Sequence, residues 1–162
     1  MKDKKLVVFD WNGTILSDTI PCWKASNVCL EFFGCPPITL KRYRETSHFP
    51  VIHFYKLNGA CVDTVLAKQD EANKIFYDAY QSLSKGARTR TGVRALLQWL
   101  EEQDFDRTIL SNYITPEIKQ QLSRLKIDHY FSHVCGNDDG NTVLEKTTKP
   151  KRLSDYMIKR GY

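Results

Sequence analysis

The sequence predicts an α/β protein with a parallel sheet, helices on both faces of the sheet and a helical segment inserted after the first strand. Three short segments, at about residues 5–10, 107–110 and 130–135, are predicted to be strands, and the first of them carries an apolar run over residues 6–9. They alternate with stretches whose apolar residues recur at helical spacing, an order that favours a three-layer α/β/α core. The 162 residues, of which 41% are hydrophobic and 27% charged, suit one globular domain with a small inserted module.

The segment between the first and second strands is predicted to be helical. Gly34 followed closely by two prolines is a typical end for the first of its helices. The predicted helices cover residues 21–33, 39–44, 53–57 and 64–83. We therefore expect residues 17–85 to form a helical module, and residues 1–16 and 86–162 to form the α/β core.

Helices and strands alternate again after this module. Thr91 is predicted to cap a helix that comes before the second strand. Thr115 is predicted to cap the helix after that strand, with Pro116 at its first position. After the third strand we expect a turn at residues 137–140 and a last helix over residues 151–159.

The end of the first strand is the most informative position in the chain. An apolar run over residues 6–9 leads directly to Asp10, and a tight polar turn follows with Asn12, Gly13 and Thr14. In open α/β sheets, ligands bind just outside the carboxyl ends of strands. A carboxylate at this place could act as a nucleophile or a metal ligand, although a strand that ends in an ordinary Asn-Gly turn gives the same pattern.

Two further polar sites follow in an order that a known family shows. The second strand ends in Leu110-Ser111-Asn112, and Thr148-Lys149-Pro150 precedes the last helix. Together with Asp-Trp-Asn-Gly-Thr after the first strand, they resemble motifs I to III of the haloacid dehalogenase-like (HAD) hydrolases. That family has a Rossmann-like core, and many members carry a helical cap inserted after motif I. The resemblance covers essentially the whole chain.

The resemblance implies a phosphatase reaction at these sites. Asp10 would attack phosphorus and form an aspartyl phosphate, while Ser111 and Lys149 hold the phosphate oxygens. Mg²⁺ would be bound by Asp10 and by the main-chain carbonyl of Asn12. The residues expected to contact the substrate are Ser111, Asn112, Gly13 and Thr14.

The inserted segment and the form of motif I are similar to the phosphoglycolate-phosphatase-like branch of the family. In the inserted segment the similarity rests on residues 42–45, residues 49–51 and Tyr55. It implies a cap that closes over the site, excludes water and selects the substrate. The candidate substrate contacts are Arg42, Arg44, His48 and Tyr55, although a packing or surface role would explain each of them as well.

Two features depart from the family pattern. Asn12 stands where typical members have an aspartate that acts as general acid and base, so either slow turnover or a different proton donor is expected. The acidic motif IV, which would complete the Mg²⁺ site, has no counterpart after the last predicted helix, because Asp138 and Asp139 precede Lys149. Without the strand that carries motif IV, the first strand would present an open edge through which two copies could pair.

Composition limits the partners and the location. The net charge of +5 favours anionic ligands, and basic residues gather near the C-terminus. No apolar run is long enough to span a bilayer, and the five cysteines are typical of reduced thiols in the cytoplasm. His129, His133 and Cys135 lie close together in the sequence but lack a fourth ligand for zinc.

Three functions fit these observations. The leading one is a Mg²⁺-dependent phosphatase that acts on a small phosphorylated metabolite. The alternative is a catalytically weak or inactive HAD-derived protein that binds phosphate or regulates a partner, a reading motivated by Asn12 and by the missing motif IV. A phosphatase of nucleic-acid ends, suggested by the basic residues, is the least favoured. We expect neither a nucleic acid nor a membrane as partner.

Overall fold

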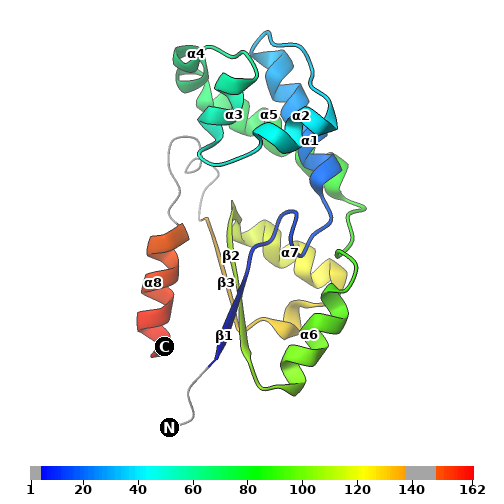
Figure 1. Ribbon diagram of the computed structural model, residues 1–162, viewed down its shortest axis with the longest axis vertical. Helices are drawn as coiled ribbons and strands as arrows, with labels where there is room; N and C mark the ends of the chain where they lie inside the picture. The colour runs from blue at the N-terminus through cyan, green and yellow to red at the C-terminus, as the bar shows by residue number, and fades with distance from the viewer. Residues whose placement is uncertain (1–4, 138–148) are drawn as a thin grey trace. The chain divides into compact units, whose positions relative to one another are not determined.

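The computed structural model describes residues 5–137 and 149–162 (Figure 1). The described residues divide into two compact units: a core unit of residues 5–17, 88–137 and 149–162, and an inserted unit of residues 18–87. The module expected from the sequence, residues 17–85, begins one residue earlier and ends two residues earlier than the inserted unit. The predicted turn at Asp138 and Asp139, and Thr148 of motif III, lie outside the described residues.

A parallel sheet lies at the centre of the core unit (Figure 1). In order across the sheet, its described strands are β1 (Leu6–Phe9), β2 (Asp106–Ile114) and β3 (His133–Asn137). β1 pairs with β2 in a register that sets Phe9 beside Ile109. The parallel sheet confirms the predicted fold class, and it brings the carboxyl ends of these strands to the same edge.

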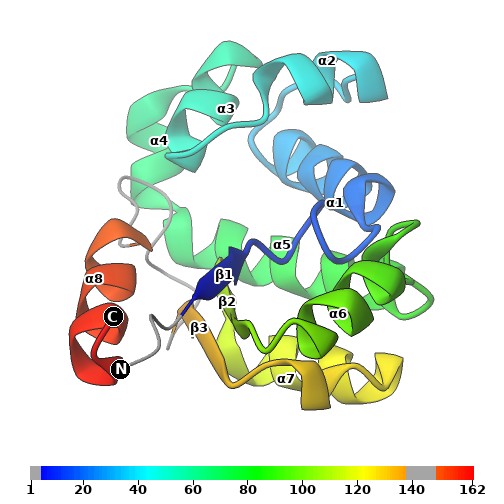
Figure 2. The same ribbon diagram turned by 60° about the horizontal axis from the view of Figure 1, so that its bottom comes forward.

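Helices cover both faces of this sheet (Figure 2). α8 (Lys149–Arg160) lies on one face, while α6 (Val93–Glu102) and α7 (Thr115–Leu125) lie on the other. A short 3₁₀ turn, Asp128–Tyr130, leads into β3. The helical side chains that are buried in this unit include Leu97, Leu100, Ile118, Leu122 and Tyr156.

Three predicted boundaries in the core unit were wrong. Gly92, not Thr91, precedes α6, and its φ of 85° is a left-handed conformation that glycine adopts without steric cost. The second strand does not end at residue 110. It continues to Ile114, which pairs with Asn137, and it leads straight into α7, so that Thr115 is the first helical residue rather than the cap.

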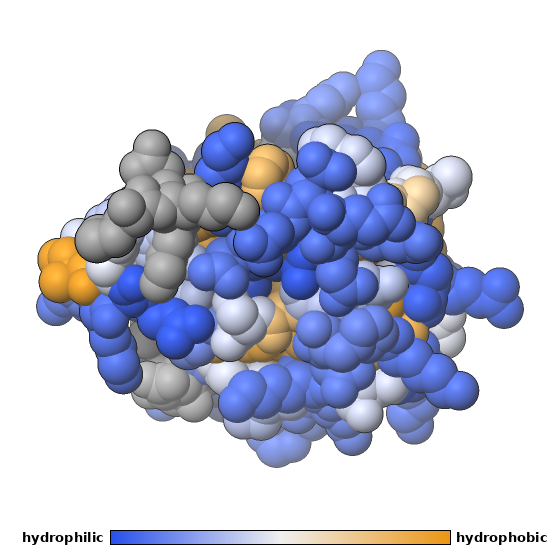
Figure 3. Space-filling model, turned by 90° about the horizontal axis from the view of Figure 1, so that it is seen from below, coloured by the Kyte–Doolittle hydropathy of each residue, from blue (hydrophilic) through white to orange (hydrophobic). Residues whose placement is uncertain are grey.

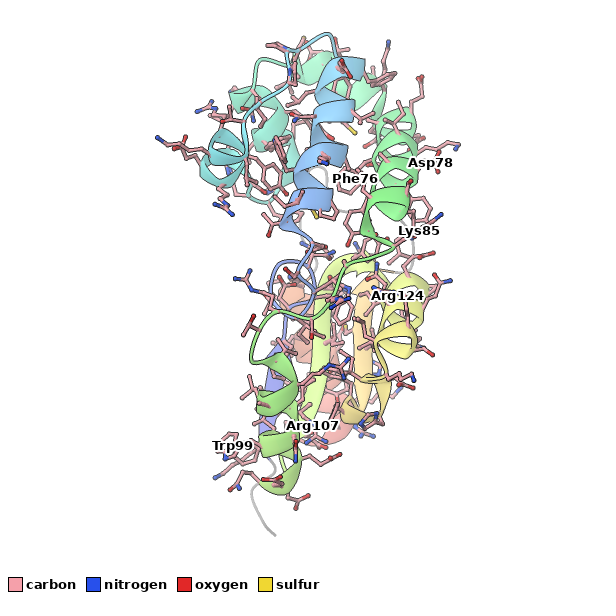
Figure 4. The ribbon with its side chains drawn as sticks, turned by 90° about the vertical axis from the view of Figure 1, so that its right-hand side faces the viewer. Phe76, Asp78, Lys85, Trp99, Arg107 and Arg124 are labelled. Atoms are coloured by element: carbon pink, nitrogen blue, oxygen red, sulfur yellow. The ribbon has the colours of Figure 1, made fainter. Side chains whose placement is uncertain are left out.

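The inserted unit is helical. Its helices are α1 (Thr19–Phe32), α2 (Leu40–Thr46), α3 (Val51–Leu57), α4 (Val62–Ala67) and α5 (Gln69–Ser84). They enclose a core of buried apolar side chains that includes Cys29, Leu30, Phe54, Tyr55 and Val65. Phe76 of α5 packs against this core, whereas Asp78 lies on the exposed side of the same helix and pairs with Lys74 (Figure 4).

The single helix predicted over residues 64–83 was wrong, because the chain breaks at Lys68. That residue has φ −114° and ψ 23°, outside the α-helical region, and it separates α4 from α5. Buried residues occur on both sides of the break, at Val65 and Ala72. The helical spacing of apolar residues therefore continues past Lys68, although the helix itself is interrupted there.

Within the core unit, the segment after β1 pairs with the segment before α6. Leu16 and Thr89 form an antiparallel bridge. The amide of Ser17 donates to the carbonyl of Arg88 at 2.8 Å, and the amide of Arg90 donates to the carbonyl of Ile15 at 2.9 Å. These bonds tie the two points at which the chain leaves and re-enters the core unit, next to the turn that follows β1.

The face shown in Figure 3 is predominantly hydrophilic, with apolar residues scattered among polar ones. Exposed large hydrophobic residues of the core unit include Val8, Leu96, Trp99, Met157 and Ile158. Trp99 projects from α6 near the start of β2, where Arg107 lies (Figure 4). In the described part of the chain, every helix is too short or too polar to cross a bilayer.

Candidate active site

Asp10 stands at the carboxyl end of β1, the first residue after the strand. Its carboxylate forms an ion pair with Lys149, the first residue of α8, with 2.7 Å between Oδ1 and Nζ. The two side chains are 45% and 26% exposed, so both remain accessible to a ligand. The structure thus brings together the predicted nucleophile and the predicted phosphate-binding lysine, which are 139 residues apart in the sequence.

Trp11 anchors the turn that follows Asp10. Its indole is fully buried and donates a 2.6 Å hydrogen bond to Oε1 of Gln121 in α7. The carbonyl of Trp11 accepts bonds from the amides of Ile15 and Leu16, each at 3.0 Å. Gly13 takes a φ of 73°, which closes the turn at low steric cost. This turn presents the three predicted positions, Asn12, Gly13 and Thr14, beside the end of β1.

Arg90 also holds this turn, and sequence reasoning missed it. Its Nη1 donates to the carbonyl of Gly13 at 2.9 Å. Arg90 lies in the segment that re-enters the core unit, where its own amide pairs with the turn as well. No spacing rule connects residues 77 apart, so only the fold reveals this contact.

The predicted motif II residues lie within β2, which continues two residues beyond Asn112 instead of ending there. Ser111 is 1% exposed, and its Oγ accepts a 3.0 Å bond from the amide of Tyr113. The carbonyl of its neighbour Asn112 accepts a 2.6 Å bond from Nδ2 of Asn137, the last residue of β3. Next to Asn137, a Cβ added to Gly136 would lie 2.7 Å from the carbonyl oxygen of Tyr113, so only glycine fits there. The ends of β2 and β3 are therefore packed tightly together.

Arg152 is the second site residue that the sequence did not single out. Its guanidinium donates to the carbonyls of Ser111 and Cys135, and to the side-chain oxygen of Asn112. Because Lys149 and Arg152 are both in α8, this one helix is bonded to Asp10, which directly follows β1, and to residues within β2 and β3. The signal available in the sequence was the spacing of three residues from Lys149, which sets both on one side of a helix.

The oxygen atoms at this edge suit Mg²⁺. Asp10 offers a half-exposed carboxylate, and the main-chain carbonyl of Asn12, two residues further on, is the second predicted ligand. Mg²⁺ is usually held by one or two carboxylates, with water and substrate phosphate as its other ligands. Among the described residues there is no group of three or more His, Cys, Asp or Glu side chains that could hold a metal. The site fits an ion that completes its coordination with phosphate and water.

Two of the four candidate substrate contacts in the inserted unit have structural roles. The guanidinium of Arg42 is bonded to the side chain of Asn58 and to the carbonyl of Leu57. Tyr55 is 5% exposed in the core of this unit, and burial raises the pKa of its hydroxyl well above the usual value. Arg44 and His48 are exposed, which leaves them as the candidates on this unit.

A Rossmann-like parallel sheet, an acidic side chain at the end of β1 and a lysine at the start of the last helix are typical of one class of hydrolases with an aspartate at the end of the first strand. The chain belongs to the haloacid dehalogenase-like hydrolases, whose family model matches residues 7–153.

Curated relatives agree with this membership. The chain is 31% identical over 165 residues to the phosphoglycolate phosphatase of Pseudomonas putida, covering 97% of this chain and 58% of that protein. It is 26% identical over 177 residues to the phosphoglycolate phosphatase of Aliivibrio fischeri, covering 99% of this chain and 72% of that protein. The chain therefore spans little more than half the length of the first of these relatives.

Solved structures share the fold. A haloacid dehalogenase-like family hydrolase of Streptococcus pneumoniae superposes with a TM-score of 0.76 at 19% identity, over 99% of this chain and 72% of that one. A haloacid dehalogenase-like hydrolase of Bacteroides fragilis superposes with a TM-score of 0.80 at 15% identity, over 98% and 73% of the two chains.

Proposed function

We propose that this chain carries the nucleophile and the phosphate site of a Mg²⁺-dependent phosphatase that acts on small phosphate monoesters. The observation that carries the proposal is the Asp10–Lys149 ion pair at the carboxyl end of β1. Family membership and the relatives named phosphoglycolate phosphatase support it. Phosphoglycolate is accordingly the first natural substrate to test.

In the first step, a carboxylate oxygen of Asp10 attacks phosphorus and the ester P–O bond breaks. The leaving alcohol takes a proton, and the phosphoryl group is left on Asp10 as an acyl phosphate. The ammonium of Lys149 lies at the carboxylate and would neutralise the charge that builds up on the phosphoryl oxygens. When bound, Mg²⁺ would supply further charge neutralisation between the Asp10 carboxylate and the phosphate.

In the second step, water attacks phosphorus, the acyl phosphate P–O bond breaks, and phosphate leaves with the Asp10 carboxylate restored. This step needs a base for the water, and the first needs an acid for the leaving group. Asn12 can do neither, since its neutral carboxamide does not ionise near neutral pH and so serves as neither an acid nor a base. General acid–base catalysis contributes about 10²–10⁴-fold, so we propose a slow enzyme.

The amides and hydroxyls at the ends of β1 and β2 would orient the phosphate. The turn with Gly13 and Thr14 is held by Trp11 and Arg90, and Ser111 and Asn112 are held by their bonds to β3 and α8. These groups are fixed before a ligand arrives, which favours binding through preorganised donors.

The five cysteines are free thiols, which supports a reducing compartment such as the cytoplasm.

The inserted unit is proposed to select the substrate. Its exposed basic residues Arg44 and His48 suit an anionic group such as a carboxylate on the far side of the ester. Binding of such a group would contribute energy from a part of the substrate that does not react.

A second function, binding of a phosphorylated ligand without turnover, is favoured by Asn12. The two are separated by hydrolysis of p-nitrophenyl phosphate with and without Mg²⁺, measured for the wild type and for Asp10→Asn. The phosphatase proposal expects Mg²⁺-dependent turnover that Asp10→Asn abolishes. Phosphate binding without turnover would favour the second function, and equal turnover in both proteins would contradict the first.

A further inference from the structure

The guanidinium of Arg152 binds two neighbouring strands at once. Nη1 donates to the carbonyl of Ser111 at 2.8 Å and to the carbonyl of Cys135 at 3.1 Å, and Nη2 donates to Oδ1 of Asn112 at 3.3 Å. The first and third acceptors belong to β2 and the second to β3. A planar arginine fork holds such a set of acceptors in one geometry, which a lysine ammonium on a flexible stem does not.

Arg152 lies three residues after Lys149, on the same side of α8. The contacts of the two side chains confirm this placement, since Lys149 reaches Asp10 after β1 and Arg152 reaches β2 and β3. The first turn of α8 is thereby fixed at two points. The contact of Arg152 with β2 and β3 limits how far α8 can slide or rotate on the sheet. It therefore determines where the ammonium of Lys149 lies.

The same contact changes the charge at the ends of the strands. The carbonyl oxygens of Ser111 and Cys135 carry partial negative charge and would repel a phosphate nearby. Arg152 donates to both of them, and its positive charge offsets this repulsion. Its neighbour Lys151 has the same formal charge but is exposed. Comparing variants of the two residues therefore distinguishes an effect of the Arg152 contacts from an effect of charge alone.

We propose that Arg152 is a positioning residue of the phosphate site, which holds α8 against β2 and β3 so that Lys149 stays on Asp10. The proposal rests on the proposed phosphatase function, because it assigns Arg152 a role in that same site. A displacement of about 1 Å in a catalytic group can lower a rate about 10²-fold, so a role of this kind is large enough to measure.

The test compares Arg152→Gln and Arg152→Lys with the matched control Lys151→Gln. For each protein we would measure kcat and KM for p-nitrophenyl phosphate, and the rate at which acetic anhydride acetylates Lys149, followed by peptide mass spectrometry. We expect Arg152→Gln to lower kcat about 10- to 100-fold, with a smaller change in KM, because positioning acts on the transition state. Acetylation of Lys149 should become several times faster, because its ion pair with Asp10 is loosened.

Lys151→Gln should change neither kcat nor the acetylation rate of Lys149 by more than about twofold, because Lys151 is an exposed charge. Arg152→Lys should fall between the wild type and Arg152→Gln. If a urea titration shows that Arg152→Gln is not stably folded, Arg152→Lys takes its place in the comparison with Lys151→Gln. Equal kcat and equal acetylation in Arg152→Gln and Lys151→Gln would overturn the proposal. If the wild type shows no turnover, the proposed phosphatase function is overturned but the role of Arg152 is not. The acetylation rates of Lys149 still show whether Arg152 holds Lys149 in place.

Discussion

Among single residues, Lys149 supplies the cation of the proposed phosphate site, through its ion pair with Asp10. Its ammonium lies 2.7 Å from Asp10, whereas Lys151, two residues further along α8, is exposed. Lys149→Met should lower kcat/KM for p-nitrophenyl phosphate about 10²- to 10³-fold, the cost of removing one preorganised donor to a transition state. Lys151→Met has the same loss of charge and should retain nearly full activity. Similar losses in the two variants would mean that the effect is only one of net charge.

Asn12 sets the expected rate. Asn12→Asp places a carboxyl group two residues after Asp10, where it can give a proton to the leaving alcohol and take one from water. We expect kcat to rise about 10²–10⁴-fold, the usual contribution of general acid–base catalysis. Asn12→Ser, which alters the same position without adding an acid, serves as the control and should stay slow. An unchanged kcat in Asn12→Asp would show that another group already transfers the proton.

The sequence was sufficient to find Asp10 and Lys149, because a polar residue at the end of an apolar strand and a lysine at a helix start are local signals. For Arg152 the sequence offered only its spacing of three residues from Lys149, and for Arg90 and Asn137 it offered no signal. Each of these three side chains donates to main-chain carbonyls. Carbonyl groups are the same at every position, so nothing in the sequence indicates which ones will be near a given arginine.

At the scale of elements, α6 illustrates how one helix joins the core unit. Leu97 is fully buried while the adjacent Leu96 is 43% exposed. Leu97→Ala should lower the free energy of unfolding by about 2–5 kcal/mol, because it removes buried methyl groups and leaves a cavity. Leu96→Ala should change it by less than about 1 kcal/mol, since a surface side chain loses little. Urea titrations followed by circular dichroism would measure both, and equal losses would contradict the placement of α6.

The elements also show where spacing stops being informative. Apolar periodicity located the buried faces but not the break at Lys68, because Val65 and Ala72 are buried on either side of it. Likewise, the length of β2 depends on its pairing with β3 at Ile114, a contact between segments far apart in the sequence. Local signals therefore gave the type of each element, and tertiary contacts decided where several of them begin and end.

At the scale of the whole molecule, β1 is the outer strand of the described sheet on one side, and its Val8 is 37% exposed. Unpaired strand edges bind other strands. We expect this 162-residue chain to self-associate through β1, with a dimer fraction that grows with concentration in analytical ultracentrifugation. Val8→Lys should weaken the association, because a charge at an edge disfavours pairing, while Ile158→Lys on exposed α8 should not. A monomer at all concentrations would exclude this edge as an interface.

The proposed phosphatase function depends on a carboxylate oxygen of Asp10 as the acceptor of the phosphoryl group. The most direct measurement is acid quenching of the chain during turnover of p-nitrophenyl phosphate with Mg²⁺, followed by mass spectrometry of the peptide that contains Asp10. We predict that this peptide gains the mass of one phosphoryl group, and that the adduct accumulates because Asn12 cannot activate water for the second step. Asn12→Asp should reduce the accumulation, and Asp10→Asn should abolish it. Turnover that continues in Asp10→Asn with no adduct would contradict the account.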